Sequence, residues 1–145
     1  MNWKSISRSQ GGSRVLLLGA GGASRGVLRP LLETGPKGLV IANRTASKAL
    51  DLAESVAALG PVRGCGLSDL GAIVSGGFDL IVNGTSAGLS GAVPDLPEGA
   101  LAPGGWAYDM LYGDGPTAFC RWGASQGAVR ALDGLGMLVE QAAES

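Results

Sequence analysis

Short runs of branched apolar residues alternate along the chain with longer segments in which apolar residues recur every three or four positions. The runs at 15–18, 39–42 and 78–83 are bounded by glycine or polar residues and are typical of strands buried on both faces. The segments 23–34 and 46–59 carry apolar residues at helical spacing. This alternation predicts an α/β fold built on a parallel sheet.

The same alternation continues more weakly in the rest of the chain. Residues 62–66 predict a strand, and the helical turn after it has Ser68 as a candidate cap. A loop rich in glycine and proline follows Gly88 and runs through Pro94, Pro97 and Pro103. The remaining expected elements are strands at 106–112 and 129–132 and helices at 117–126 and 135–144. We therefore expect a doubly wound, six-stranded parallel sheet of the Rossmann type, with ligands at the carboxyl ends of its strands.

Composition narrows the possible functions. The 145 residues carry a net charge of −1 and no histidine, which provides no basic surface for nucleic acid or a membrane and excludes histidine-based catalysis. Cys65 and Cys120 lack metal-ligand spacing, and we expect free thiols in a reducing cytoplasm. No apolar run approaches the ~20 residues that span a bilayer. Residues 1–13 are expected to be a polar leader and residues 14–145 a single domain.

The glycine-rich sequence after the first expected strand predicts a phosphate-binding turn. Gly19 permits a tight turn, and Gly21 leaves room for a pyrophosphate beside the backbone. The N–H groups that open the next helix would then face the anion. Ser24 stands where the dinucleotide-binding motif has its third glycine, so the match is to a looser form of the motif. A purely structural turn is the alternative.

The end of the second expected strand bears on the choice of cofactor. A carboxylate there would bind the ribose 2′-hydroxyl of NAD and repel a 2′-phosphate, but the chain has Asn43, Arg44 and Thr45, followed by Lys48. Arg44 can form paired hydrogen bonds with a phosphate, and Lys48 adds a positive charge. These residues favour NADP, although a helix cap with a solvated cationic face is an alternative explanation.

Small polar residues follow the fourth expected strand. Asn83, Gly84, Thr85 and Ser86 stand where a nicotinamide ribose would pass in such a fold. Their hydroxyl groups and backbone N–H groups suit that role. A plain turn would use the same residue types.

Five motifs in order resemble the nucleotide domain of bacterial shikimate dehydrogenases, from about residue 13 onward. They are GAGGASRG from Gly19, NRTASKA from Asn43, NGTSAG from Asn83, YDMLYGDGPTAF from Tyr108 and DGLGMLVEQA from Asp133. The resemblance implies that the pyrophosphate is held by Gly19, Ala20, Gly21, Gly22 and Ala23, and the 2′-phosphate end by Asn43, Arg44, Thr45, Ala46, Ser47 and Lys48. It also implies that Met110 and Gly134 lie at the nicotinamide end and that Tyr112 and Gln141 reach the substrate.

The resemblance also implies an activity. The family reversibly reduces 3-dehydroshikimate to shikimate with NADPH, in aromatic amino-acid biosynthesis. Its catalytic lysine and aspartate belong to an amino-terminal substrate domain, which we expect to be absent here because the lysines present are Lys4, Lys37 and Lys48. We therefore expect NADP binding, slow or no turnover, no catalytic residue in this chain, and shikimate as a ligand only together with the missing domain. Self-association through the surface that the missing domain would cover is also expected.

Two other interpretations stay open from the sequence. The chain could be a freestanding NADP-binding module without catalysis, or the cofactor domain of a quinate dehydrogenase. Tyr112 and Gln141 favour the shikimate group. The family more often has alanine where this chain has Gly84, a difference that is not expected to change the role of this segment.

Overall fold

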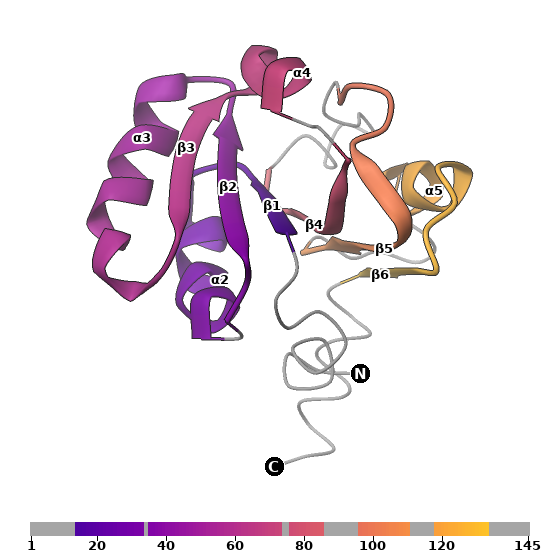
Figure 1. The fold of residues 1–145 in the computed structure, drawn as a ribbon, viewed down its shortest axis with the longest axis horizontal. Helices are drawn as coiled ribbons and strands as arrows, with labels where there is room; N and C mark the ends of the chain where they lie inside the picture. Colours follow the sequence, from indigo (N-terminus) through magenta and orange to yellow (C-terminus); the bar gives the residue numbers. More distant parts are fainter. Residues whose placement is uncertain (1–13, 34, 74–75, 86–95, 111–117, 134–145) are drawn as a thin grey trace.

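The computed structural model describes residues 14–33, 35–73, 76–85, 96–110 and 118–133, in which strands and helices alternate (Figure 1). The strands are β1 (Arg14–Leu18), β2 (Gly38–Asn43), β3 (Val62–Gly66), β4 (Phe78–Asn83), β5 (Leu101–Asp109) and β6 (Arg130–Asp133). The helices are α2 (Gly22–Glu33), α3 (Ala46–Ser55), α4 (Leu70–Ile73) and α5 (Ala118–Ser125), with the short 3₁₀ helices η1 (Ala57–Leu59) and η2 (Leu67–Asp69).

The described strands form one parallel sheet in the order β3-β2-β1-β4-β5-β6. At its centre, Leu18 of β1 pairs with Ala42 of β2 on one side and with Asn83 of β4 on the other. The chain leaves β1 toward β2 and, after β3, crosses back to β4 on the opposite side of β1. Such a reversal opens a crevice at the carboxyl ends of the two strands where it occurs, which is where parallel sheets bind ligands.

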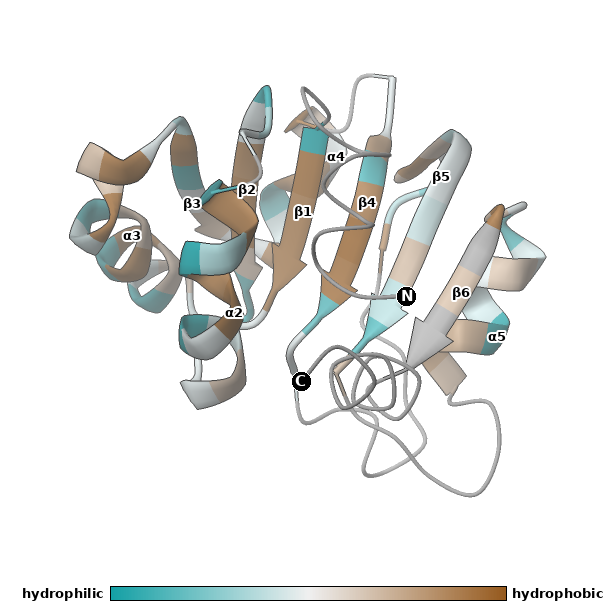
Figure 2. Ribbon diagram, turned by 90° about the horizontal axis from the view of Figure 1, so that it is seen from below, coloured by the Kyte–Doolittle hydropathy of each residue, from teal (hydrophilic) through white to brown (hydrophobic). Residues whose placement is uncertain are grey.

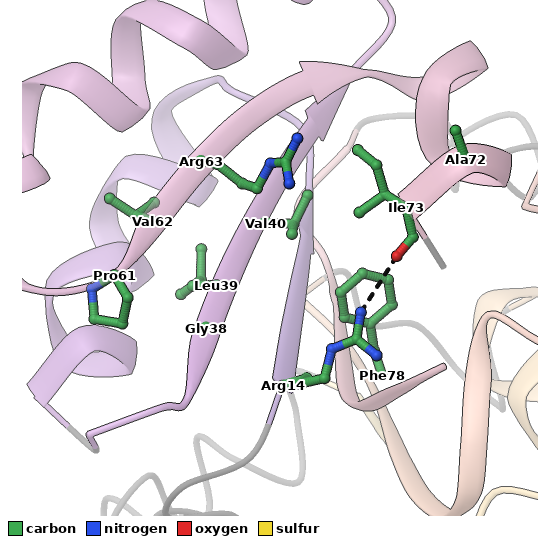
Figure 3. A pocket seen from close by; sticks show the side chains of 10 residues that line it. All are labelled: Arg14, Gly38, Leu39, Val40, Pro61, Val62, Arg63, Ala72, Ile73 and Phe78. Carbon is green, nitrogen blue, oxygen red and sulfur yellow. Dashed lines mark hydrogen bonds between the residues drawn. The ribbon is translucent and has the colours of Figure 1, made fainter. Parts of the chain in front are cut away.

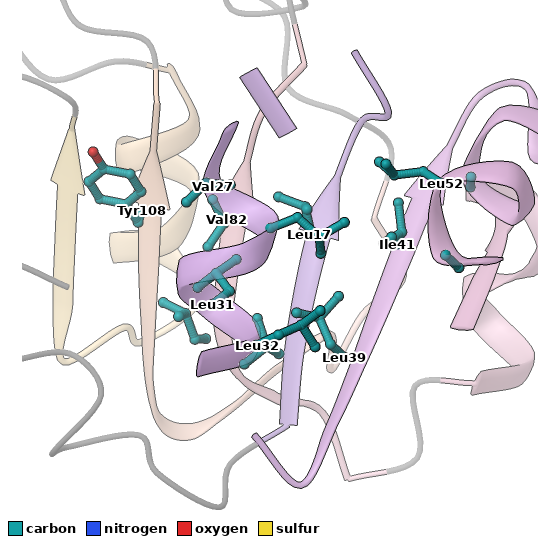
Figure 4. Close-up of a cluster of buried hydrophobic side chains, with 14 of the residues drawn as sticks. Leu17, Val27, Leu31, Leu32, Leu39, Ile41, Leu52, Val82 and Tyr108 are labelled. Carbon is teal, nitrogen blue, oxygen red and sulfur yellow. The ribbon is translucent and has the colours of Figure 1, made fainter. Parts of the chain in front are cut away.

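Helices cover both faces of the sheet. On one face Leu17 packs in a cluster with Leu31 of α2 and residues of α3 (Figure 4). On the other face Leu16 belongs to a cluster that includes Phe119 of α5 and a residue of α4. Because neighbouring side chains of a strand point to opposite faces, the central strands must be apolar almost throughout. β1 and β4 are accordingly hydrophobic along most of their length (Figure 2).

The hydrophobic pattern predicted most of this architecture. The α/β class and the parallel sheet are confirmed, and the strands expected at 62–66 and 78–83 have the same bounds in the structure. The helix expected at 46–59 is divided, because α3 ends at Ser55 and η1 begins at Ala57. The helix expected at 135–144 lies outside the described residues.

The fifth strand differs most from its prediction, which placed it at 106–112. It runs instead from Leu101 to Asp109, because a bulge accommodates residues that are typical of a loop. Phe78 and Leu80 of β4 pair with Leu101 and Trp106 of β5. The segment of β5 between these two paired residues is therefore longer than the segment of β4 that it faces. Gly104 within this bulge has a φ of 79°. A bulge tolerates such glycine and proline residues, which concealed the start of the strand in the sequence.

The cap before α4 also differs from its prediction. Ser68 is an exposed residue inside η2 and is not the cap. The carboxylate of Asp69 instead accepts a hydrogen bond from the backbone N–H of Gly66 at 3.2 Å. Ser68 and Asp69 are both suitable capping residues, so only the backbone geometry distinguishes them.

Cys65 and Cys120 are buried free thiols, as predicted. Burial raises the pKa of the Cys65 thiol and nearby Asp69 raises it further, partly offset by Arg63, so this thiol is neutral near pH 7 and is a poor nucleophile. No group of three or more histidine, cysteine, aspartate or glutamate side chains in the described ranges could hold a metal ion. No helix in the same ranges is long and apolar enough to cross a membrane.

We predict that Gly64 fixes the distance between β3 and α3. A methyl group at this position would overlap backbone atoms of Ala49 and Leu50 in α3. Because the helix backbone would have to move, Gly64→Ala should lower the free energy of unfolding by about 1 to 3 kcal/mol, measured by urea denaturation. Gly71→Ala is the matched control, since a Cβ on this exposed residue meets nothing within 4 Å. Equal stabilities of the two variants would contradict this role for Gly64.

Candidate functional site

The turn between β1 and α2 lies at the carboxyl edge of the sheet, where the phosphate site was predicted. Gly19 has a φ of 98°, a left-handed conformation that favours glycine, and its N–H donates to the Ala42 carbonyl at 2.8 Å. Helix α2 begins at Gly22, and the N–H of Arg25 donates to the Gly21 carbonyl at 3.0 Å. The N–H groups of the first helical turn that lack an acceptor inside the helix can bind an anion.

Gly21 and Gly22 leave open space beside this helix start. Both are exposed, and a Cβ at either position would meet no atom within 4 Å. Neither has the positive φ that excludes other residues. The packing of the described residues therefore does not require glycine here, whereas close approach of a pyrophosphate to the backbone does.

The same turn touches the end of β4. A Cβ on Gly19 would lie 3.2 Å from atoms of Gly84 and Thr85, and the N–H of Gly84 donates to the Leu18 carbonyl at 2.8 Å. The hydroxyl of fully buried Ser24 donates to that carbonyl at 3.3 Å. A Cβ on Gly84 would overlap the Ser24 oxygen. Serine at the third glycine position of the motif is therefore coupled to the glycine at position 84.

Two cations are exposed at the end of β2. Arg44 and Lys48 face solvent, and neither has a hydrogen bond or ion pair through its side chain with the part of the chain that the structure describes. Thr45 occupies the N-cap position of α3 with an extended backbone, but its side chain makes no cap hydrogen bond. The side chain of Asn43 instead donates to the Thr45 carbonyl at 3.1 Å. Helix capping therefore does not account for the threonine hydroxyl, which stays available to a ligand.

The side chain of Asn83 links the ends of β4 and β5. Its Nδ2 donates to Oδ1 of Asp109 at 3.3 Å, and its Oδ1 accepts from the N–H of Thr85 at 3.2 Å and from the Thr85 hydroxyl at 2.7 Å. The N–H of Met110 donates to the backbone carbonyl of Asn83 at 3.0 Å. Asn83 and Asp109 are fully buried. This edge of the sheet thus contains an ordered polar network beneath its surface.

The structure brings the described members of the predicted site to one edge of the sheet. They lie at the carboxyl ends of four strands, namely residues 19–23 after β1, residues 43–48 at the end of β2, Asn83 and Thr85 at the end of β4, and Met110 after β5. Sequence reasoning gave no role to Asp109, although a carboxylate directly after an apolar run was a signal for one. Four further predicted site residues lie outside the described residues, namely Ser86, Tyr112, Gly134 and Gln141.

A separate pocket of about 700 Å³ lies at the opposite edge, among the amino-terminal parts of β1 to β4 (Figure 3). At this pocket the Arg14 guanidinium donates to the Ile73 carbonyl at 3.3 Å and lies 5.1 Å from the centroid of the Phe78 ring. None of the predicted site residues lines this pocket. Since parallel sheets bind ligands at the carboxyl ends of their strands, we place the candidate site at the carboxyl edge beside Gly19.

A glycine turn between the central strand of a parallel sheet and a helix defines a Rossmann-like α/β domain. Comparison with known proteins shows to which family this domain belongs. The family model described as shikimate / quinate 5-dehydrogenase matches residues 3–90, and the chain belongs to this family.

A curated relative agrees with this assignment, and two solved enzymes share the fold. The shikimate dehydrogenase (NADP(+)) of Chromohalobacter salexigens is 57% identical over 134 residues, which are 92% of this chain and 48% of that protein. The chain thus spans about half the length of this curated relative. The Ael1 enzyme from Pseudomonas putida superimposes with a TM-score of 0.78 at 44% identity, over 97% of this chain and 51% of the other. The 5-ketofructose reductase of Gluconobacter sp. strain CHM43 gives 0.76 at 32% identity, over 96% and 51%.

We predict that Ser24 and Gly84 are energetically coupled. Gly84→Ala should lower the free energy of unfolding by about 1 to 3 kcal/mol, because its methyl group displaces the buried Ser24 hydroxyl. Adding Ser24→Ala removes the overlap, so the double variant should be about 1 kcal/mol more stable than the two separate losses imply. Urea denaturation of the full cycle measures the coupling. Gly21→Ala, whose Cβ meets open space, is the control and should leave stability unchanged. Additive losses would show that the two positions are independent.

Proposed function

We propose that this chain is the NADP-binding half of a shikimate dehydrogenase, which reversibly reduces 3-dehydroshikimate to shikimate with NADPH in aromatic amino-acid biosynthesis. The observation that carries the proposal is the end of β2, where Arg44 and Lys48 are exposed, no carboxylate is present at 43–48, and Ala42 is hydrogen-bonded to the glycine turn at Gly19. Family membership and the printed name of the Chromohalobacter salexigens relative support NADP as the cofactor.

In this proposal the cofactor lies across the carboxyl edge of the sheet. Its pyrophosphate binds at the start of α2, beside Gly21. Its 2′-phosphate pairs with the Arg44 guanidinium, with Thr45 and Lys48 adding a hydroxyl and a positive charge. Its nicotinamide ribose lies near Thr85. When bound, the nicotinamide donates or accepts the hydride, and this chain binds and orients it.

Several features of the fold support a dinucleotide site of this kind. The strand order, with β1 and β4 adjacent at the centre, and the helices on both faces support a doubly wound sheet of six strands. In that arrangement the two halves of a dinucleotide bind on either side of the central reversal. Met110 lies on the β4 and β5 side, where the nicotinamide end is expected, and Gly134 and Ser86 stay predictions for the same end.

The substrate side of the site is proposed from the family. Tyr112 and Gln141 stay predictions for residues that contact shikimate. The catalytic lysine and aspartate would come from the part of the relatives that this chain does not match, since the relatives are about twice its length. Lys37 precedes β2 and Lys48 lies in the first turn of α3 after it, and both are exposed.

Quinate dehydrogenase is the second candidate, and the description of the matching family supports it. The 5-ketofructose reductase shares this architecture at 32% identity, so the cofactor half is compatible with more than one substrate. A freestanding NADP-binding module would use the same cofactor residues without turnover. Cytoplasmic location and self-association stay predictions.

We expect NADP to stabilise the chain and NAD to do so much less. At ~100 times its dissociation constant a ligand adds about 2.7 kcal/mol, a shift of several degrees in thermal unfolding. Arg44→Ala should abolish the NADP shift, because the guanidinium would no longer pair with the 2′-phosphate. Lys37→Ala removes an equal charge at the other end of β2 and should keep the shift. Equal shifts with NADP and NAD would contradict the assignment of the 2′-phosphate site.

We also expect these 145 residues alone to reduce 3-dehydroshikimate slowly or not at all. Loss of general acid–base catalysis alone typically costs a factor of ~100 to ~10,000. Adding the unmatched half of the Chromohalobacter salexigens relative as a separate polypeptide should increase turnover, measured as NADPH oxidation. A normal rate without that addition would show that this chain carries its own proton donor.

A further inference from the structure

We propose that Asp109 is a positioning residue that fixes Thr85 as a hydrogen-bond acceptor toward the nicotinamide end of the cofactor. The inference rests on the proposed function and specifies the chemistry of one part of that site. It starts from the three side chains of Asp109, Asn83 and Thr85, which are hydrogen-bonded in series at the carboxyl ends of β4 and β5.

The chemistry of each group sets the direction of the series. A carboxylate only accepts hydrogen bonds, so the Asn83 atom that faces Asp109 at 3.3 Å must be the amide nitrogen. The amide oxygen of Asn83 then faces Thr85. The backbone N–H of Thr85 can only donate, and it reaches that oxygen at 3.2 Å. A flipped amide would leave two donors facing each other at Thr85, so both neighbours select the same orientation.

In this orientation the Asn83 amide oxygen accepts the hydroxyl proton of Thr85. The hydroxyl oxygen lies 2.7 Å from the Asn83 amide oxygen, which carries no proton, so the Thr85 hydroxyl is the donor. Only the lone pairs of the hydroxyl are left for a ligand. Thr85 therefore accepts from a donor group, such as a ribose hydroxyl or the carboxamide NH₂ of the nicotinamide. A phosphate or carboxylate oxygen in its place would bring no proton for a hydrogen bond.

Burial makes the arrangement persistent. Asn83 and Asp109 are both 0% exposed, so water does not compete for their hydrogen bonds, which are stronger in a low-dielectric environment. Thr85 is half-buried and its methyl group lies against the turn at Gly19. The threonine side chain is thus held between the glycine turn on one side and Asn83 on the other.

Calorimetric titration of the 145-residue chain with two ligands tests the proposal. NADP spans the whole site, whereas 2′-phospho-ADP carries only the adenosine end and the pyrophosphate. Asp109→Asn replaces a group that can only accept with an amide that can also donate, so one of the two constraints on the orientation of Asn83 is lost and NADP should bind about tenfold more weakly. Binding of 2′-phospho-ADP should change by less than about twofold, because this ligand does not reach Thr85. If the unaltered chain binds neither ligand, the proposed function itself fails.

Exchanging the carboxylate and the amide between positions 83 and 109 should restore NADP binding. In the double variant Asn83→Asp/Asp109→Asn, the carboxylate at position 83 accepts from the amide at position 109 and from both donors of Thr85. The net charge is unchanged, and NADP affinity should return to within about threefold of the original. An Asp109→Asn variant that binds both ligands equally weakly would reveal a purely structural role and overturn the proposal. A double variant that binds NADP no better than Asp109→Asn would do the same.

Variants of Thr85 keep the proposal testable if Asp109→Asn does not fold. Thr85→Val preserves the shape of the side chain and removes the hydroxyl, so NADP should bind about tenfold more weakly while 2′-phospho-ADP is little affected. Thr85→Ser keeps the hydroxyl and should bind NADP more tightly than Thr85→Val. Undiminished NADP affinity in Thr85→Val would overturn the role of Thr85 as an acceptor.

Discussion

The close approach of the turn after β1 to the end of β4 is the constraint on which the rest of the site depends. The N–H of Gly84 holds it by donating to the carbonyl of Leu18 in β1, and the N–H of Gly19 ties the same turn to the carbonyl of Ala42 in β2. A Cβ atom at Gly19 would contact Gly84 and Thr85, and a Cβ atom at Gly84 would overlap Ser24. The ends of three strands are thereby tied together, and the groups that follow them, including Thr85, take fixed positions.

The glycines of this edge divide into two kinds. Gly19 and Gly84 are required by the protein, through a positive φ or through neighbouring atoms that leave no room for a methyl group. Gly21 and Gly22 are not required by any contact among the described residues. Open space at this helix start is compatible with the proposed approach of a pyrophosphate to the backbone.

Much of this could be predicted from the sequence, for identifiable reasons. The central strands were evident because burial on both faces demands continuous apolar runs, and the turn at Gly19 was evident because glycine is the residue that a tight turn of this kind favours. The start of β5 was missed because its bulge holds proline and glycine. The interaction of Asn83 with Asp109 joins residues 26 positions apart, and that of Ser24 with Gly84 crosses from α2 to β4. Such contacts arise from the register of the sheet, which no local pattern reveals.

The order of the strands also fixes the distance between the two ends of the candidate site at the carboxyl edge. β2, β1, β4 and β5 are consecutive neighbours, so the cationic end beside Arg44 and the polar network beneath Thr85 and Met110 are separated by up to three strand spacings, about 14 Å. That span cannot be adjusted by loop movement, because each interval is a row of backbone hydrogen bonds. A molecule that contacts both ends must therefore be extended and of matching length.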